Sequence, residues 1–263
     1  MFFKNLCSRI LFLFLFFPLM CVVPIPVSAA DDTIRICNDG EWPPYGYKDP
    51  VNDRRGIGIT IDILHEIFRR QNLKIETTIF PWKRCENNVK KGEYQVVTDI
   101  SKNPERVKTF LVSDPLYEVR HAFYYDKTRY PDGPPITTAE DVNRFSVGAI
   151  FGYDLNMYKF DITKIDSGTK TIDSLLKKLR RKYIDLAIGY VGVCEALEKM
   201  GKINLTGLER MEIPGTPSQV YHVMFTRKKG GEKLLEIFNK GLEELKSEGY
   251  YQKVFRKYGI PLK

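Results

Sequence analysis

Short strand-like segments alternate with amphipathic helical segments along most of the chain, and this order restricts the fold more than any other feature. Alternating polar and apolar residues indicate half-buried strands, whereas apolar residues spaced three and four apart indicate helices that pack on a sheet. A β-α-β-α-β series produces a parallel or mixed sheet with right-handed crossovers, so we predict an α/β fold. The first series comprises strands at 33–37, 73–80 and 94–98 and helices at 56–68 and 82–92.

A polar, proline-rich stretch at residues 130–135 marks the clearest internal boundary, because such residues favour turns and loops. A second α/β series begins at residues 145–150, and the chain returns through a strand at residues 219–226. We therefore expect two lobes, the second inserted in the first, that form a hinged cleft for a small molecule. The expected boundaries are 30–122 plus 224–263 for lobe 1 and 123–223 for lobe 2.

The N-terminus has the pattern of a secretory signal peptide. Lys4 and Arg9 precede an apolar run that ends at Val23, and small residues at 28–30 offer a cleavage site. The run is short for a membrane span, which needs roughly 20 apolar residues. An uncleaved anchor is the alternative. We expect residues 1–29 to be removed and the mature protein to reside in the periplasm.

The charge balance argues against a nucleic-acid-binding protein. The net charge of the whole chain is +8, and loss of a leader that holds Lys4, Arg9 and no acidic residue lowers it to +6. This excess is spread along the chain, and no block of interleaved basic and aromatic residues stands out. We expect no nucleic-acid partner, and a charge that serves solubility or the attraction of an anionic ligand.

Cysteine and histidine usage restricts the covalent and metal chemistry. Three cysteines, Cys37, Cys85 and Cys194, remain after the leader, so an oxidising compartment allows at most one disulfide and leaves one free thiol. Only three histidines are present, and no two cysteines have the close spacing of a structural zinc site. We therefore expect neither a metal nor a cofactor.

The stretch from Thr98 to Tyr117 combines the features of an anion site. Asn103 is a good N-cap and Pro104 suits the first helical position, so a helix should begin there, between Ser101 and the side chain of Arg106. Arginine offers a planar fork of donors, and a helix start adds a partial positive charge, so the group can hold a carboxylate. An ordinary loop with a surface arginine is the alternative.

Two tryptophans and one glycine follow predicted strands. Trp42 and Trp82 each lie just past a strand end, where open α/β sheets bind ligands, although tryptophans also serve as core residues. Gly152, after the strand at 145–150, should let the backbone approach a ligand and expose N–H groups at the start of a following helix. These loops would form the two sides of the cleft.

Taken together, these residues resemble the family 3 periplasmic solute-binding proteins, which serve polar amino acid ABC importers. The most specific part is Ser101, four residues, Arg106 and then Phe-Leu-Val-Ser-Asp-Pro-Leu-Tyr at 110–117. Further similarity lies at 56–63, 147–152 and 249–258, so the resemblance covers essentially the whole mature chain. It implies a type II two-lobe periplasmic binding protein fold.

The resemblance also implies roles for individual residues. Arg106 would pair with the ligand carboxylate, helped by Ser101 and the backbone at Tyr153. Trp42 and Trp82 occupy the positions of aromatic residues that cover the ligand, and Asp39 that of an acid near its distal end. Two departures limit the carry-over. Tyr190 stands where an acid usually binds the ligand's ammonium group, and Asn103 replaces a common threonine.

We accordingly expect a monomeric, non-enzymatic protein that captures a small polar carboxylate-bearing metabolite, an amino acid or related compound, and delivers it to the permease of an ABC importer. Two alternatives are a dehydratase-like enzyme, with Asp39, Glu41 or Asp154 as its acid, and a sensor that partners a membrane receptor. We also expect Cys37 and Cys85, which both lie in lobe 1, to form the disulfide. Cys194 would then remain a small buried residue.

Overall fold

The computed structural model describes residues 33–228 and 230–260. The predicted signal peptide, residues 1–29, lies outside these ranges. Within them, no helix is long and apolar enough to cross a membrane. The strands are β1 Thr33–Asn38, β2 Glu41–Trp42, β3 Gly46–Lys48, β4 Gly56–Ile57, β5 Lys74–Ile79, β6 Val96–Ser101, β7 Phe110–Val112, β8 Tyr117–Val119, β9 His121–Asp126, β10 Val147–Ile150, β11 Asp166–Thr169, β12 Leu186–Tyr190, β13 Leu208–Glu212 and β14 Gln219–Thr226. The helices are α1 Ile59–Arg70, α2 Trp82–Lys91, α3 Pro104–Thr109, α4 Ile172–Arg180, α5 Val191–Lys199, α6 Gly231–Ser247 and α7 Tyr250–Lys257, with 3-10 turns η1 Glu140–Arg144 and η2 Ile162–Lys164.

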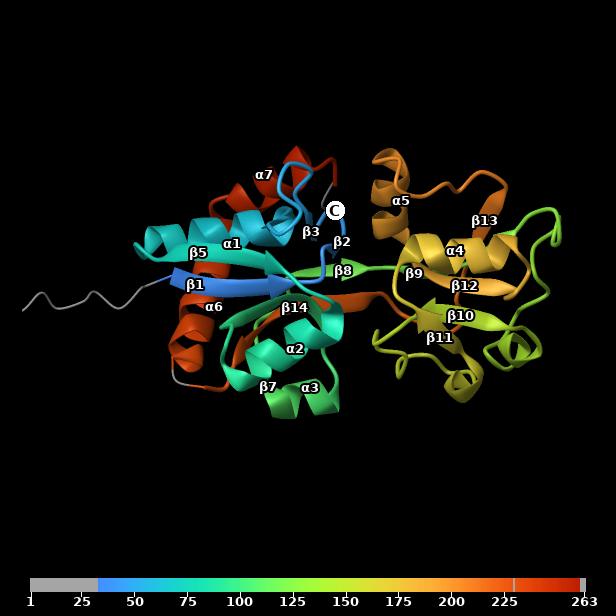
Figure 1. Ribbon diagram of the computed structural model, residues 1–263, viewed down its shortest axis with the longest axis horizontal. Coiled ribbons are helices and arrows are strands. Elements are labelled where there is room, and N and C mark those ends of the chain that lie inside the picture. The colour runs from blue at the N-terminus through green and yellow to red at the C-terminus, as the bar shows by residue number, and fades with distance from the viewer. Residues whose placement is uncertain (1–32, 229, 261–263) are drawn as a thin grey trace, which may run out of the picture. The chain divides into compact units, whose positions relative to one another are not determined.

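The first sheet has the order β5-β1-β6-β14-β7, and β8 also pairs with β14 (Figure 1). Strands β5, β1 and β6 are parallel, as the alternation of strands and helices predicts, whereas β14 returns antiparallel to β6. The carboxyl ends of β1 and β6 therefore lie at one edge of the sheet. Residues that follow these strands, including Asn38 and Ser101 at their last positions, can reach a common site there.

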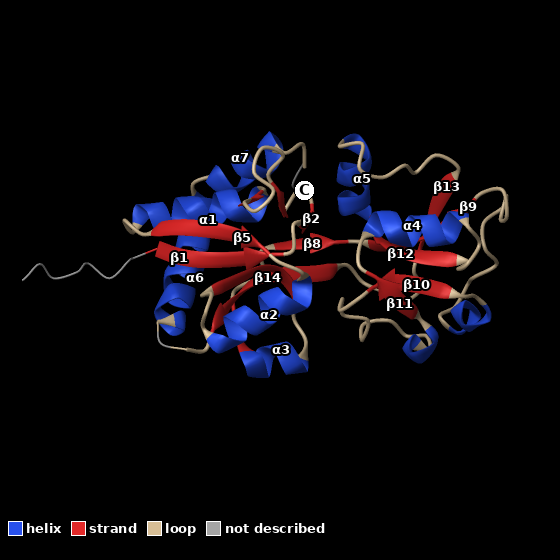
Figure 2. Cartoon of the chain, viewed as in Figure 1, coloured by secondary structure: helices blue, strands red, loops and turns tan. Residues whose placement is uncertain are grey.

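Alternation of side chains along the strands divides the core of the first sheet into two layers. Val96 and Phe225 belong to the cluster that includes α1, α6 and α7. Val97 and Met224, the adjacent residues, belong to the opposite cluster, which includes α2 residue Val89. Figure 2 shows the helices distributed over both faces of the strands. Successive side chains of a strand point to opposite faces of the sheet, so neighbouring apolar residues contribute to different layers when both faces are covered.

The second sheet has the order β11-β10-β12-β9-β13. Strands β10, β11 and β12 are parallel, and β9 is antiparallel to both β12 and β13. One face packs on α4, through apolar residues spaced three and four apart, and on α5; the other packs on the irregular segment between β9 and β10 and the residues after β10. The carboxyl ends of β10 and β12 form the second edge that carries candidate site residues.

The chain passes between the two sheets twice. It leaves the first sheet between Val119 and His121 and re-enters it between Glu212 and Gln219. The second sheet is thus formed by residues inserted within the sequence of the first. The expected boundaries at 122/123 and 223/224 remain a prediction.

Capping residues fix the two short helices beside the site. Asn103 accepts a hydrogen bond from the backbone N–H of Arg106, and Pro104 takes the first position of α3, as expected. Helix α2 begins at Trp82 and ends at Lys91, and its C-cap residue Gly92 adopts the left-handed conformation with φ 83°. Trp82 is thereby placed at the start of α2, and Arg106 in the first turn of α3.

Gly152 does not lie at the start of the following helix, contrary to the expectation. Gly152 does have a positive φ of 80°, but residues 151–153 form a turn, and the next α-helix begins at Ile172. The Asp154 carboxylate instead accepts hydrogen bonds from the backbone and side chain of Asn156, which stabilises an irregular loop.

A disulfide joins Cys37, near the end of β1, to Cys85 in α2, which confirms the expected pairing. Their Cα atoms are 5.7 Å apart, and both residues are fully buried under the first sheet. Cys194 is free and buried, and its burial raises the pKa of its thiol to about 11. It therefore stays neutral and inert at neutral pH.

Candidate functional site

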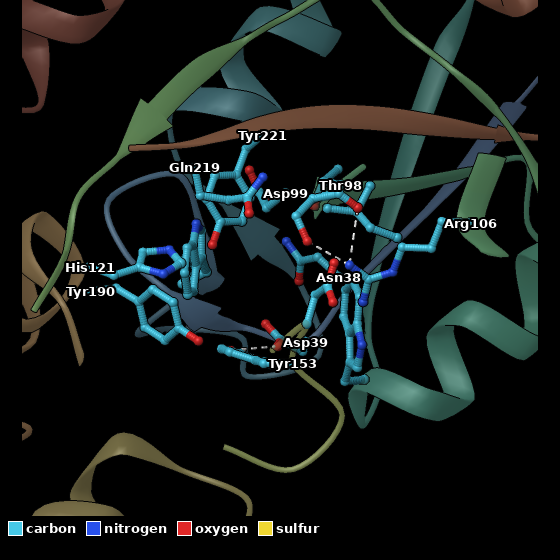
Figure 3. A pocket seen from close by; sticks show the side chains of 15 residues that line it. Asn38, Asp39, Thr98, Asp99, Arg106, His121, Tyr153, Tyr190, Gln219 and Tyr221 are labelled. Atoms are coloured by element: carbon cyan, nitrogen blue, oxygen red, sulfur yellow. Dashed lines mark hydrogen bonds between the residues drawn. The ribbon is translucent and has the colours of Figure 1, made fainter. Parts of the chain in front are cut away.

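One cavity brings together all seven ligand-binding residues that the sequence predicts. It lies where the carboxyl ends of β1, β6 and β12 meet the start of β14 (Figure 3). Its volume is about 30 Å³, room for about two water molecules. The lining residues are Asn38, Asp39, Trp42, Trp82, Thr98, Asp99, Ile100, Ser101, Arg106, His121, Tyr153, Asp154, Tyr190, Gln219 and Tyr221.

Arg106 forms the cationic side of this cavity. Its Nη1 donates hydrogen bonds to the Ser101 side-chain oxygen at 2.7 Å and to the Ser101 carbonyl at 3.0 Å, so the two predicted partners are adjacent. Nε also pairs with Glu86 at 3.3 Å, a contact between α2 and α3 that the sequence did not indicate. The Arg106 side chain is only 9% exposed. Nη2 has no hydrogen bond to any described residue and is the free part of the fork.

Asp39 lies on the loop after β1 and is held on both oxygens. Oδ1 accepts the Glu41 backbone N–H at 3.1 Å, and Oδ2 accepts the Tyr153 hydroxyl at 3.3 Å. Burial raises the pKa of Asp39 to about 6, and the nearby Glu41 and Asp99 charges add to the rise, while these two hydrogen bonds oppose it. A carboxyl group with such a pKa in a cavity marks a functional-site candidate.

Aromatic side chains account for the small volume of the cavity. Trp42 is 4% exposed and contacts the rings of Tyr153, Tyr190 and Tyr221 at centroid distances of 5.7, 4.7 and 5.0 Å. These rings come from elements of both sheets. Pockets for small molecules span about 300–1,000 Å³, so entry of a metabolite requires these rings, or the two sheets, to separate.

Trp82, the second predicted tryptophan, lies at the start of α2 on the other side of the cavity. Its ring is 5.5 Å from the guanidinium carbon of Arg106 and 6.5 Å from the ring of Tyr153. Its Nε1 is buried and has no hydrogen-bond partner among the described residues. An indole N–H that is buried in this way is a ready donor for a polar ligand.

Tyr190 occupies the last position of β12 and faces the cavity (Figure 3). Burial is the main cause of its raised pKa, so the hydroxyl is neutral. His121 packs against it with ring centroids 4.6 Å apart, and burial lowers the pKa of His121 to about 4. Both groups are uncharged at neutral pH, so this wall offers aromatic faces and hydrogen bonds only.

Asp99 is a cavity residue that sequence reasoning missed. Its Oδ1 accepts hydrogen bonds from the Thr60 hydroxyl at 2.6 Å and the Tyr117 hydroxyl at 2.7 Å. Oδ2 is buried with no hydrogen-bond partner among the described residues. Asp99 lies two positions before Ser101 on β6, but its φ of 58° interrupts the alternation of side chains there, so strand spacing does not single it out. Burial raises its pKa, and the hydrogen bonds oppose the rise.

Asp154, one of the acids considered for an enzyme, also lines the cavity, whereas Glu41 does not. Asp154 Oδ2 accepts a hydrogen bond of 3.0 Å from Asn103, the N-cap residue of α3. Asn103, which stands where the resembling family commonly has threonine, therefore links the loop before α3 to the loop after β10. In the described residues, no group of three metal-ligating side chains could hold a metal ion.

The chain belongs to the bacterial extracellular solute-binding proteins, family 3, whose family model matches residues 34–261. It is 21% identical over 240 residues to a probable histidine-binding protein of Neisseria gonorrhoeae, covering 89% of this chain and 85% of that protein. The family match agrees with the resemblance carried by Ser101, Arg106 and residues 110–117.

Solved structures show the same two-lobe periplasmic binding protein fold. An ancestral arginine-binding protein bound to arginine superposes with a TM-score of 0.69 at 24% identity, covering 86% of this chain and 98% of that one. A histidine kinase sensor domain with similarity to periplasmic binding proteins gives a TM-score of 0.73 at 22% identity, covering 86% and 95%. The α/β, two-lobe prediction is thus confirmed.

Proposed function

We propose that this protein is an exported, monomeric binding protein that captures an amino acid, or a related small carboxylate, between its lobes and delivers it to an ABC importer. The observation that carries this proposal is the Arg106–Ser101 pair, because it lies in a cavity lined by residues of both sheets. Arg106 Nη2 is available for a carboxylate oxygen, and a bidentate or multiple charge-assisted contact gives both strength and orientation.

The aromatic residues give the proposal its closing mechanism. Trp42 comes from β2, in the small sheet β2-β3-β4 that follows β1, whereas Tyr153 follows β10 and Tyr190 ends β12 in the second sheet. A ligand that contacts both sets binds the closed form more tightly than the open form, and this difference in affinity is what shifts the population. The probable histidine-binding relative and the arginine-bound ancestral structure, as named, support an amino acid as the ligand class.

A thermal-shift screen of the mature protein against the common amino acids and small carboxylates tests the proposal. A ligand at 100 times its dissociation constant should add about 2.7 kcal/mol to the free energy of unfolding. Calorimetry on each hit should then give a one-to-one complex. Absence of any hit among carboxylate-bearing compounds would contradict the ligand class.

Two variants make the test specific to Arg106. Arg106→Ala should lower affinity for the hit by 100-fold or more, since it removes the buried partner of the carboxylate. Arg106→Lys keeps the charge but not the planar fork, so it should bind with intermediate affinity. Unchanged affinity in Arg106→Ala, with a native circular dichroism spectrum, would refute the assigned role.

A second candidate, an enzyme on the same fold, is favoured by one observation. Asp39 is a cavity carboxyl group whose pKa is raised to about 6, close to the range that suits a general acid. Nuclear magnetic resonance of the bound compound after prolonged incubation separates the two functions. Recovery of unchanged ligand supports a binding protein, whereas steady conversion that Asp39→Asn abolishes supports the enzyme.

A further inference from the structure

We propose that Asp99 binds the ammonium group of the ligand, so that the cleft selects a zwitterion with its carboxylate on Arg106 and its cationic group on Asp99. This inference rests on the proposed function and names the chemical class of its ligand. The ammonium group of a ligand needs a negatively charged partner, which Tyr190, a neutral phenol, cannot provide.

Three aspartates line the cavity, and their hydrogen bonds distinguish them. Asp39 has a donor on each oxygen, from Glu41 and Tyr153. Asp154 also has donors on both oxygens: Asn156 on Oδ1 and Asn103 on Oδ2. Among the described residues, only Asp99 combines a place on the cavity wall with a buried carboxylate oxygen that lacks a donor. A buried carboxylate oxygen without a partner is costly, so the site favours a donor with positive charge.

The described residues around Asp99 orient its carboxyl group without placing a cation against it. Thr60 and Tyr117 both donate to Oδ1, which orients the group. No lysine, arginine or histidine among the described residues forms an ion pair with Asp99. Arg106, the cation of this cavity, pairs with Glu86 instead. Gly46 makes room for it: a Cβ on Gly46 would lie 2.2 Å from Asp99 Oδ2. The glycine thus permits a carboxylate where a larger neighbour would exclude it.

Aromatic faces beside Asp99 add to the attraction for a cation. Trp42 and Tyr221 line the same cavity, with ring centroids 5.0 Å apart, and Tyr221 stacks on Tyr117 at 5.5 Å. A cation over such rings is stabilised, most strongly where water is excluded. Asn38, whose side-chain oxygen and nitrogen are both buried without partners among the described residues, offers a further acceptor.

The position of Asp99 places both charged contacts on the same lobe. Asp99 and Ser101 belong to β6, and Arg106 follows in α3. A zwitterion can therefore dock with both charges on the first sheet while the lobes are open. The second lobe then contributes Tyr153 and Tyr190, which cover the ligand without adding charge.

The test compares free amino acids with their Nα-acetyl derivatives, because acetylation removes the ammonium charge and keeps the carboxylate. The twenty common L-amino acids and their Nα-acetyl forms are titrated into the mature protein and into Asp99→Asn and Asp39→Asn, with thermal shift followed by calorimetry. Asparagine retains a carbonyl that accepts from Thr60 and Tyr117, so Asp99→Asn should fold. Wild type should prefer the free amine about 30-fold or more, and Asp99→Asn should reduce this preference to a few-fold.

The outcomes separate this inference from the proposed function. Tight binding of a free amino acid whose preference over the acetyl form survives in Asp99→Asn overturns the role of Asp99 and leaves the proposed function intact. Loss of the preference in Asp39→Asn instead assigns the charge to Asp39 and also overturns it. Equal binding of both forms by wild type, or absence of binding to all forty probes, overturns the zwitterion class. The proposed function is overturned only if the small carboxylates of the thermal-shift screen also fail to bind.

Discussion

The Tyr153 hydroxyl donates a hydrogen bond of 3.3 Å to Asp39 Oδ2, and the two residues come just after strands of different sheets. A second bond of the same kind joins Asn103 to Asp154 at 3.0 Å. Hydrogen bonds to charged groups contribute about 1.5–3 kcal/mol, so these two contacts favour the closed cleft.

We predict that Tyr153→Phe combined with Asn103→Ser, which keeps an N-cap oxygen for α3 but removes the amide donor to Asp154, opens the protein without unfolding it. The ratio of closed to open molecules should fall by about tenfold or more, because both acceptors regain water in the open form. Small-angle scattering of the ligand-free protein should show a larger radius of gyration.

Tyr158→Phe is the matched control for this prediction. Its hydroxyl bonds to His121 Nδ1 at 2.7 Å, within the part of the chain that forms the second sheet. Its loss should leave the scattering curve unchanged. An equal radius of gyration in the double variant and wild type would contradict the role given to the two contacts.

The raised pKa of Asp39 predicts a pH-dependent stability. Between about pH 4 and 6 the folded protein keeps a proton on Asp39 that the unfolded chain, with a pKa of 3.8, has released. The contribution of Asp39 to stability therefore falls as pH rises through this window. Asp39→Asn should be more stable than wild type at pH 7.5 by about 3 kcal/mol, with the difference disappearing below pH 4.

Urea unfolding at several pH values checks this prediction. His121 acts with the opposite sign, because its folded pKa is lowered to about 4, so its contribution is lost as pH falls from 6.5 toward 4. Both proteins contain His121, so their difference isolates Asp39. A stability difference that does not change with pH would show that Asp39 titrates normally.

Removal of the Cys37–Cys85 disulfide should weaken the first lobe. The bridge closes a loop with a sequence separation of 48, and the chain-entropy estimate for that length is about 4 kcal/mol. Guanidinium unfolding of a double alanine variant should show a loss of this order relative to oxidised wild type. An unchanged midpoint in the double variant would mean that the bridge adds no net stability.

Close packing of α1 on α6 predicts the effect of a methyl group. A Cβ on Gly241 would lie 2.6 Å from Ile67 Cγ2, so Gly241→Ala should destabilise the protein by about 1–2 kcal/mol despite the better helix propensity of alanine. Thermal unfolding measures the change.

Gly192→Ala provides the comparison, because it also places alanine in a helix but meets only the Tyr45 hydroxyl at 3.9 Å. It should be neutral or slightly stabilising. If both variants shift the melting temperature equally, then the contact with Ile67 is not the cause.

Local rules were sufficient for much of the fold and the site. The cap at Asn103, the stop at Gly92 and the two strand-end tryptophans can be predicted from residue chemistry within a few positions. The helix expected after Gly152 failed because glycine permits a turn but does not determine the conformation of the next residues. Here Asp154 closes an irregular loop instead.

Contacts between distant segments could not be foreseen in the same way. Glu86 meets Arg106 only because α2 and α3 lie side by side, and nothing in either segment alone indicates the pair. Asp99 depends on a backbone φ of 58° in β6 and on the absence of a side chain at Gly46, both of which are tertiary features. Sequence patterns identify residue types at strand ends, whereas pairing across the cleft is decided by packing.

The pairing of β14 with β6 makes the site sensitive to strand length. Tyr221 lies opposite Ser101, and Gln219 and Tyr221 line the cavity, with Val220 between them. Because side chains alternate, deletion of one residue in the cavity-facing end of β14 would turn Val220 and His222 toward the ligand. The loop at 213–218 that precedes the strand carries no such restriction, so natural length variation should be tolerated there and excluded from the strand.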